Sequence, residues 1–196
     1  MNRADIVELH YITPIGNVPS ILEHGILSNR RAARLTHVSV AMKEIQDRRQ
    51  DKKIPGARPL HDYANFYFDA HNPMLSKRRN QNDVICVLRI DPAILDVLGV
   101  IVADRNAASG YVRFYPAADG IRALDREMVF AKFWLNPADP IDEMIRKSLK
   151  CAEVLVPDML EPRFVAGAYV ANERALGAFQ ALTIPLPVAI NNGMFF

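Results

Sequence analysis

Short apolar runs separated by turns dominate this sequence, and they limit the folds that it can adopt. Runs that favour buried or half-buried strands occupy residues 6–12, 61–68, 83–91, 99–104, 153–157, 163–171 and 183–190. A doubly wound parallel sheet would require strands and helices in regular alternation, and these runs do not alternate in that way. The pattern predicts a mixed α+β fold with many short strands.

The expected helices are few and short, and most carry recognisable end signals. Asn17, Pro19 and Gly25 predict the cap, first turn and end of one helix. Further helical patterns cover 92–98, 140–150 and 173–182. Segment 126–135 is apolar enough to be either strand or helix.

Length and composition are those of one domain with a sizeable core. The chain has 196 residues, half of them hydrophobic, and we expect a single domain over 1–196 with a basic loop or helical insertion at about 29–59. No apolar run reaches the roughly 18 residues that a membrane-spanning helix needs. Because Asp5 and Glu8 interrupt the N-terminal segment, it lacks the apolar stretch of a signal peptide, and we expect a cytoplasmic protein.

The two cysteines and the glycines exclude several common kinds of site. Cys86 and Cys151 both lie in apolar strand-like runs, which predicts buried reduced thiols. There is no Cys/His cluster at zinc spacing, so we expect no metal. There is also no Gly-rich phosphate loop of either common pattern, so any nucleotide would be held by a different architecture.

Charge is distributed unevenly along the chain. The net charge is +2, but residues 29–80 contain twelve Lys/Arg and five Asp/Glu, a balance of +7 against −5 elsewhere. Such a basic block is typical of a polyanion-binding surface, and it is equally compatible with a solvated surface segment.

Glu153 introduces one carboxylate into the apolar stretch KCAEVLVP, residues 150–157. An ionised carboxylate beside buried strand residues costs several kcal/mol, to order of magnitude, unless it is paired or used. From this stretch alone, an edge-strand glutamate that points to water remains a simple alternative to a catalytic one.

Four motifs in order give a resemblance to a known family. They are LHYITPIGNVPSILEHGILS (9–28), EIQDRR (44–49), LHDYANFYFDAHNPML (60–75) and KCAEVLVP (150–157). Together they resemble the DarT family of DNA ADP-ribosyltransferase toxins. The resemblance implies the ADP-ribosyltransferase fold, an α+β split-sheet sandwich with short flanking helices that binds NAD+ as co-substrate. It also implies transfer of ADP-ribose to a base in single-stranded DNA, with release of nicotinamide.

The resemblance assigns the catalytic roles to Glu153 and Arg49. Breaking the nicotinamide–ribose bond builds positive charge on the ribose, which a carboxylate can stabilise while it also accepts a proton from the attacking base. An arginine of QDRRQ would neutralise the pyrophosphate, and we favour Arg49 over Arg48.

Other NAD+ contacts are expected from the N-terminal motif and from the aromatic strand. The family pattern Tyr-His-Ile-Thr-His reads His-Tyr-Ile-Thr-Pro here, so which side chain touches the ribose is open. The expected cofactor-binding residues are His10, Tyr11, Thr13, Asn17, Arg48 and Tyr67.

The basic block supplies the expected DNA contacts, because phosphate contacts provide most of the nonspecific affinity for nucleic acids. The candidates are Arg30, Arg31, Arg34, Lys52, Lys53, Arg58, Arg78 and Arg79, with Asn72 and Met74 from HNPML. Arg105 and Asn106 could read the base or form an ordinary turn.

Guanine is the favoured acceptor base over thymine, because the segments NFYFDAHNPML and 101–114 resemble the guanine-directed branch of the family. Cys151, two residues before Glu153, is a poor hydrogen-bonding group for an arginine acceptor. Transfer to RNA or protein, or a catalytically silent nucleic-acid-binding module, remain alternatives. The resemblance also implies a partner antitoxin with ADP-ribosyl-hydrolase activity, a macrodomain or similar, and we expect a monomer.

Overall fold

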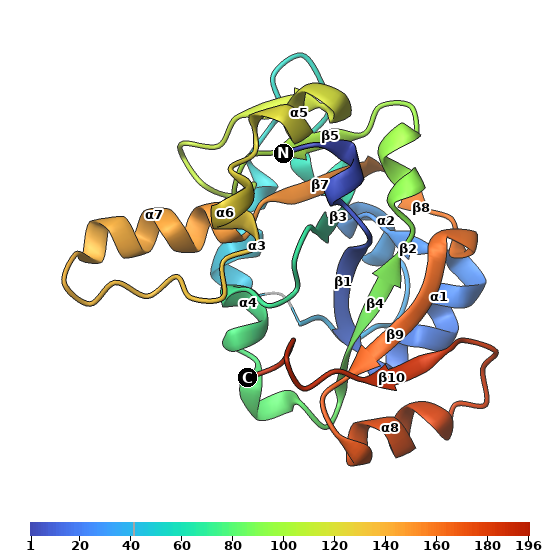
Figure 1. Ribbon diagram of the computed structural model, residues 1–196. Coiled ribbons are helices and arrows are strands. Elements are labelled where there is room, and N and C mark those ends of the chain that lie inside the picture. Colours follow the sequence, from blue (N-terminus) through green and yellow to red (C-terminus); the bar gives the residue numbers. More distant parts are fainter. Residues whose placement is uncertain (41) are drawn as a thin grey trace.

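A mixed sheet of eight strands organises the computed structural model, which describes residues 1–40 and 42–196 (Figure 1). The strand order is β10-β9-β4-β1-β3-β7-β5-β6, and β2 and β8 form a separate antiparallel pair. The bounds are β1 Leu9–Pro14, β2 Ile26–Leu27, β3 Tyr63–Tyr67, β4 Ile85–Ile90, β5 Ile101–Ala103, β6 Phe114–Pro116, β7 Glu153–Pro157, β8 Met159–Leu160, β9 Val165–Val170 and β10 Val188–Ile190.

The helices are short and lie around the sheet. They are α1 Val18–His24, α2 Asn29–Ala32, α3 Lys43–Gln50, α4 Pro73–Ser76, α5 Ala117–Ala123, α6 Arg126–Val129, α7 Pro140–Lys150 and α8 Glu173–Gln180. Short 3-10 turns cover Arg3–Asp5, Ile15–Asn17, Leu60–Asp62, Arg79–Gln81, Pro92–Asp96 and Pro162–Phe164. None of the helices in the described part of the chain is long and apolar enough to cross a membrane.

The eight strands divide into two halves that meet at one point. β1 pairs with β4 over six residue pairs, from Leu9↔Ile90 to Pro14↔Ile85. In the described part of the chain, β1 pairs with β3 at a single position, His10↔Tyr67. Beyond that pair the two strands diverge, so β10-β9-β4-β1 and β3-β7-β5-β6 behave as two half-sheets. The expected split-sheet α+β fold is therefore confirmed.

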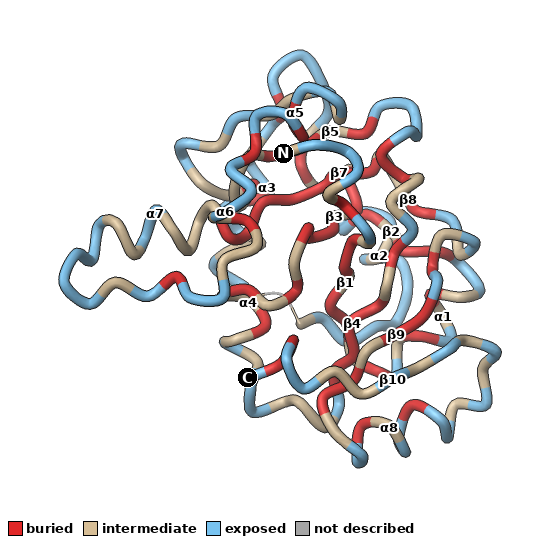
Figure 2. The backbone as a smooth tube through the Cα atoms, in the orientation of Figure 1, coloured by how far each residue is buried: buried red, intermediate tan, exposed pale blue. Residues whose placement is uncertain are grey.

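Buried residues concentrate on the central strands (Figure 2). In β4 every residue except Arg89 is buried, and Val154, Leu155 and Val156 of β7 are also buried. Strands covered on both faces read as continuous apolar runs, which is why these two were recognisable from the sequence. Both cysteines are buried and unpaired, as expected.

Helix α7 leads directly into the strand that carries Glu153. Asp139 caps its first turn by accepting hydrogen bonds from the backbone of Ile141 and Asp142, both at 3.0 Å. At its other end Lys150 is buried, where it pairs with Asp69 and donates to the carbonyl of Val129 at 2.8 Å. The chain is thus fixed before β7 begins, while the first turns of α7 project from the body of the protein (Figure 1).

Several expected boundaries differ from the structure. The first strand runs to Pro14 instead of ending at residue 12, because Thr13 and Pro14 still pair with β4. Segment 92–98 is not an α-helix: Pro92–Asp96 form a 3-10 turn, a form that is common in short connectors. In 126–135 only Arg126–Val129 is helical, and Phe133 is exposed. Within the expected insertion at 29–59 the structure shows α2 and α3, and residue 41 lies outside the described residues.

Gly120 and Gly177 provide a matched pair of substitutions for testing how α5 packs on the sheet. A Cβ at Gly120 would lie 2.4 Å from the Cβ of Val102 in β5, whereas a Cβ at Gly177 in α8 would meet no described atom within 4 Å. We expect Gly120→Ala to lower the free energy of unfolding by about 1–3 kcal/mol through overpacking. Gly177→Ala should raise it by about 0.5–1 kcal/mol through helix propensity. Urea unfolding measures both, and equal effects would contradict this packing.

Candidate active site

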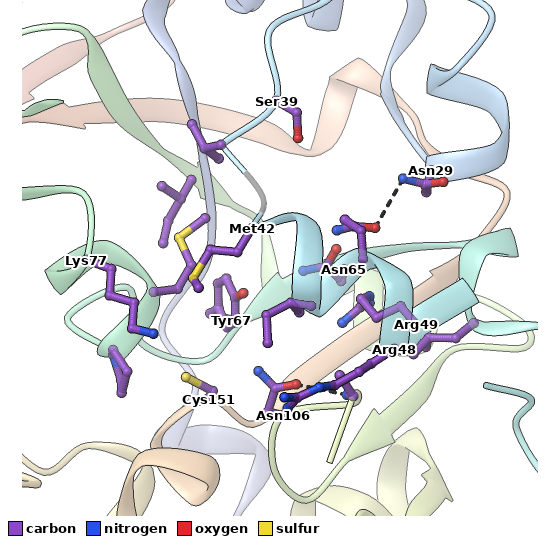
Figure 3. A pocket seen from close by; sticks show the side chains of 18 of the residues that line it. Asn29, Ser39, Met42, Arg48, Arg49, Asn65, Tyr67, Lys77, Asn106 and Cys151 are labelled. Carbon is purple, nitrogen blue, oxygen red and sulfur yellow. Dashed lines mark hydrogen bonds between the residues drawn. The ribbon is translucent and has the colours of Figure 1, made fainter. Parts of the chain in front are cut away.

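A cavity of about 700 Å³ opens where β1 and β3 diverge. Its walls come from Tyr11–Pro14 of β1, from Asn65 and Tyr67 of β3, and from α2, α3, α4, α7 and the loop 105–111. Figure 3 shows the mixture of side chains inside, with amides and guanidinium groups on one side and sulfur, aromatic and ammonium groups on the other. A cavity of this size and mixed lining suits a dinucleotide or a similarly large organic ligand.

Glu153 lies directly behind the wall of this cavity. It is the first residue of β7 and is fully buried, at 0% exposure. Its backbone pairs with Tyr67 of β3 on one side and with Ala103 of β5 on the other. Because Tyr67 also pairs with His10 of β1, Glu153 stands in the row where the two half-sheets join. It does not point to water, so the edge-strand alternative is wrong.

Three hydrogen bonds hold the buried carboxylate. Nη1 of Arg49 lies 2.9 Å from Oε2 and 3.2 Å from Oε1. The backbone N–H of Ala107 donates to Oε1 at 2.9 Å. Arg49 itself is only 5% exposed. A buried ion pair is tolerated when good geometry and further hydrogen bonds satisfy it, and both conditions are met here.

Helix α3 directs two neighbouring arginines to different places. Successive residues of an α-helix point about 100° apart, so Arg49 faces inward to Glu153 while Arg48 is exposed. Both line the cavity, and Arg49 pairs with Glu153, which is not itself part of the lining. No ion pair involving Arg48 occurs among the described residues, which leaves its guanidinium available to an anionic ligand.

Two neighbours of Glu153 that line the cavity, the Tyr67 phenol and the Cys151 thiol, keep their protons. Burial, assisted by the charge of Glu153, raises the pKa of the Tyr67 phenol well above its ordinary value. Burial and the same charge raise the pKa of the Cys151 thiol to about 12. Both groups are therefore neutral at physiological pH, and the Arg49–Glu153 pair carries the formal charge at this end of the cavity.

One rim of the cavity is held by contacts from two distant elements. The amide of Asn17 donates to the carbonyl of Val38 at 2.7 Å and accepts from its backbone N–H at 3.2 Å. Arg78 donates from Nε and Nη2 to the carbonyl of Val40, at 2.9 and 2.6 Å. Asn17 occupies the expected N-cap position of α1 but makes no capping bond, because its side chain is used on this rim.

The loop that supplies Ala107 is tied to the segment after α3. The ammonium group of Lys52 donates to the carbonyl of Ser109, and burial lowers the pKa of this lysine. Arg49 thus contacts the Glu153 carboxylate itself. Lys52 contacts the loop whose Ala107 N–H donates to that carboxylate.

The structure brings most of the expected NAD+-binding residues together. Tyr11, Thr13, Asn17, Arg48 and Tyr67 all line the cavity. His10 does not: its Nε2 lies 3.1 Å from Glu8, outside the cavity lining. In the described residues no group of three or more His, Cys, Asp or Glu side chains could hold a metal ion.

The expected DNA contacts do not form one surface. Met74 lines the cavity, Lys53 and Arg79 are exposed, and Arg30, Arg31 and Arg34 line a second cavity. Lys52 and Arg78 are used internally, as described above.

Asn72 is fully buried, which is at odds with its expected role in DNA contact. Its Oδ1 accepts from the backbone of Met74 and Leu75 as the cap of α4, and its Nδ2 donates to the carbonyl of Asp69. Asn is a preferred N-cap residue and Pro a preferred first helical residue, which explains why Asn72 is used in this way.

Some cavity residues were not singled out from the sequence. Asn65, Lys77 and Ser148 line the cavity, and the N–H of Ala107 reaches Glu153. Asn65 could have been found, because it shares the strand face of Tyr67 by alternation. A backbone N–H carries no residue-specific signal and could not have been found.

Comparison with known proteins gives one consistent result. Residues 10–196 match the family described as "ssDNA thymidine ADP-ribosyltransferase, DarT". The chain is 31% identical over 176 residues to a DNA ADP-ribosyl transferase–DNA ADP-ribosyl glycohydrolase fusion protein of Thermosipho africanus, covering 84% of this chain but 42% of the fusion. It is also 31% identical over 190 residues to a DNA ADP-ribosyl transferase of Thermus aquaticus, covering 91% of this chain and 82% of that protein.

Two solved structures share the fold over nearly the whole chain. Thermosipho africanus DarTG in complex with ADP-ribose superposes with a TM-score of 0.82 at 28% identity, covering 96% of this chain and 51% of that one. Thermus sp. 2.9 DarT in complex with ADP-ribosylated ssDNA superposes with a TM-score of 0.83 at 22% identity, covering 100% and 99%.

The Arg49–Glu153 pair can be tested by a double-mutant cycle on stability. Arg49→Met leaves the Glu153 charge buried with only the Ala107 donor, and we expect it to lower the free energy of unfolding by about 3–5 kcal/mol. In a Glu153→Gln background the same change should cost much less, because no buried charge is left unpaired. Urea unfolding of the four proteins measures the coupling. Strictly additive effects would show that the two side chains do not depend on each other.

Proposed function

The chain belongs to the DarT family of ssDNA ADP-ribosyltransferases, and on that premise we propose that it transfers ADP-ribose from NAD+ to a base of single-stranded DNA. The observation that carries the proposal is the buried Glu153 carboxylate, held by Arg49 and Ala107 immediately behind a cavity of dinucleotide size.

The cavity offers the groups that NAD+ requires. Arg48 and Arg49 can neutralise a pyrophosphate in the absence of a Gly-rich loop. Tyr67 presents a neutral aromatic ring next to Glu153, suited to stacking on nicotinamide. Tyr11, Thr13 and Asn17 also line the cavity and are the groups that we expect beside the sugars. When bound, NAD+ supplies an ADP-ribosyl group whose bond to nicotinamide breaks, with the electron pair leaving on the nicotinamide nitrogen.

Arg49 controls access to the carboxylate. It pairs with the fully buried Glu153, so we propose that the guanidinium shifts before the ribose reaches Glu153. A pyrophosphate carries more negative charge than one carboxylate and offers the arginine a competing partner. The hydrogen bond from Ala107 keeps the carboxylate oriented when Arg49 moves.

Glu153 then performs two tasks. Its negative charge stabilises the positive charge that develops on the ribose, and its oxygens accept hydrogen bonds from the ribose hydroxyls. As the base nitrogen attacks the anomeric carbon, Glu153 accepts the proton that the nitrogen loses. The buried, low-dielectric surroundings strengthen the electrostatic part of this catalysis.

Guanine is the acceptor base that we propose in place of thymine. Asp104 holds the guanidinium of Arg105 through Nε at 3.1 Å and Nη2 at 3.3 Å, which leaves further N–H groups for a ligand. Arginine pairs well with the O6 and N7 acceptors of guanine, and Arg105 and Asn106 both line the cavity.

The cellular role follows from the same premise. The Thermosipho relative is named as a transferase fused to a DNA ADP-ribosyl glycohydrolase, the opposite activity. We propose that this chain is a toxin that acts on DNA in the cytoplasm, and that an antitoxin with ADP-ribosyl-hydrolase activity reverses its modification.

The role of Glu153 is tested by transfer from labelled NAD+ to single-stranded DNA. Glu153→Gln should lower the rate by at least about a hundredfold, because it removes the charge that stabilises the ribose. Glu127→Gln, which changes an exposed glutamate of α6 outside the cavity, is the matched control and should keep the native rate. Unfolding curves of both variants show whether they are folded. Native transfer by a folded Glu153→Gln protein would refute the assignment.

The acceptor base is tested with two single-stranded oligonucleotides, one lacking guanine and one lacking thymine. We expect label only on the oligonucleotide that contains guanine, with mass spectrometry of the digested nucleosides locating the ADP-ribose. Arg105→Gln should reduce this labelling, since it removes the guanidinium that would pair with O6 and N7 together. Modification of thymidine alone would contradict the guanine assignment and leave the transferase assignment intact.

A further inference from the structure

A second cavity, of about 590 Å³, lies on the other side of α2 from the proposed NAD+ site. We call it the arginine cleft and define it by Ser28, Arg30, Arg31, Arg34, Asp62 and Asp158. The chemistry proposed for Glu153 uses none of these residues.

Guanidinium groups surround the arginine cleft and are held in place by carboxylates. Nε of Arg30 lies 3.0 Å from Oδ1 of Asp62, and Nη2 of Arg31 lies 3.5 Å from Oδ1 of Asp158. Asp158 also pairs at 2.7 Å with Arg58, which stands next to the cleft. Arg34 makes no ion pair among the described residues. The cationic groups outnumber the carboxylates, and the side chains of Arg30 and Arg31 remain 60% and 48% exposed, so the cleft is open to an anion.

Ser28 is an unsatisfied polar group in the wall of this cleft. The residue is 1% exposed, and its Oγ has no hydrogen-bond partner among the described residues. It precedes α2 but makes no capping bond with its side chain. A buried hydroxyl without a partner costs about 1–3 kcal/mol. A ligand with acceptor oxygens bound in the cleft would remove that cost.

The backbone of Asp158 is a second source of unfavourable free energy in the arginine cleft. Its φ is +62°, a left-handed conformation that costs a non-glycine residue about 1–3 kcal/mol. The conformation lets its carbonyl accept from the backbone N–H of Ser28 at 2.8 Å while its carboxylate holds Arg31 and Arg58. Backbone strain of this kind is concentrated at ligand-binding positions.

Helix α2 separates the arginine cleft from the reaction cavity. Asn29 and Ala32 line the reaction cavity, Arg30, Arg31 and Arg34 line the cleft, and Leu27 lines both. Asn29 also donates to Gln46 of α3 at 3.2 Å, which fixes α2 at the edge of the reaction cavity (Figure 3). A ligand that leaves the reaction cavity over α2 has only the width of one helix, roughly 10 Å, to cross.

From these observations we propose that the arginine cleft binds a phosphodiester group of the same DNA strand whose base enters the reaction cavity. A planar guanidinium group can donate two parallel hydrogen bonds to two oxygens of a phosphate group. The Ser28 hydroxyl donates to a third oxygen. The proposal rests on the proposed function in one respect, that the acceptor is single-stranded DNA. The cleft thereby sets the path of the strand on the protein, while the reaction cavity selects the base.

The test measures binding of a fluorescein-labelled single-stranded oligonucleotide over a range of salt concentrations, without NAD+. Arg31→Gln/Arg34→Gln should weaken binding several-fold and reduce the slope of log affinity against log salt by about 0.7 for each phosphate that the variant no longer neutralises. Because no NAD+ is present, the result does not depend on whether transfer takes place.

Ser28→Ala separates binding from folding. The native Oγ has no partner among the described residues, so the variant should unfold at the same temperature or higher, yet it should bind the oligonucleotide several-fold more weakly. Arg174→Gln is the matched control, because Arg174 is 82% exposed and pairs with Asp83 outside both cavities. Native affinity and native salt dependence in both cleft variants, or equal losses in Arg174→Gln, would overturn the proposal.

Discussion

The hydrogen bonds that hold the Glu153 carboxylate are the interaction on which the rest of the site depends. A charge with no exposure to water is stable here because Arg49 and Ala107 arrive from two separate segments and satisfy both oxygens. Those segments are fixed in turn: α3 positions Arg49, and Lys52 secures the loop that contains Ala107. The carboxylate therefore determines where α3 and the loop 105–111 must lie relative to β7.

The division of the sheet turns this buried pair into a functional site. β1 and β3 join only at His10 and Tyr67 in the described part of the chain, and the next backbone partner in that row is Glu153. The cavity opens at the one place where the strands separate, beside the carboxylate. The proposed approach of a substrate to a residue in a buried strand depends on this split.

Much of the fold was predictable because it depends on local patterns. The strands at β4 and β7, the helices α1, α7 and α8 and the family itself were recognised from apolar runs, end signals and motif order. Predictions were incomplete where tertiary contacts decide the direction and the partner of a side chain. Arg48 and Arg49 are chemically identical neighbours, and only the position of α3 shows which one faces Glu153. Asn17 lines the cavity, but its hydrogen bonds to the backbone of Val38 depend on a tertiary contact that no local pattern shows. An apolar pattern also does not guarantee burial, because Phe133 in the apolar segment 126–135 lies exposed on the surface.

The proposed role of Glu153 is to act on the ribose next to nicotinamide. A crystal structure of the protein with a non-hydrolysable NAD+ analogue would show this contact. We expect the Arg49 guanidinium to leave the carboxylate and the Glu153 oxygens to come within hydrogen-bond distance of the hydroxyls of that ribose. A bound analogue with Glu153 still enclosed by Arg49, and with the ribose elsewhere in the cavity, would contradict it.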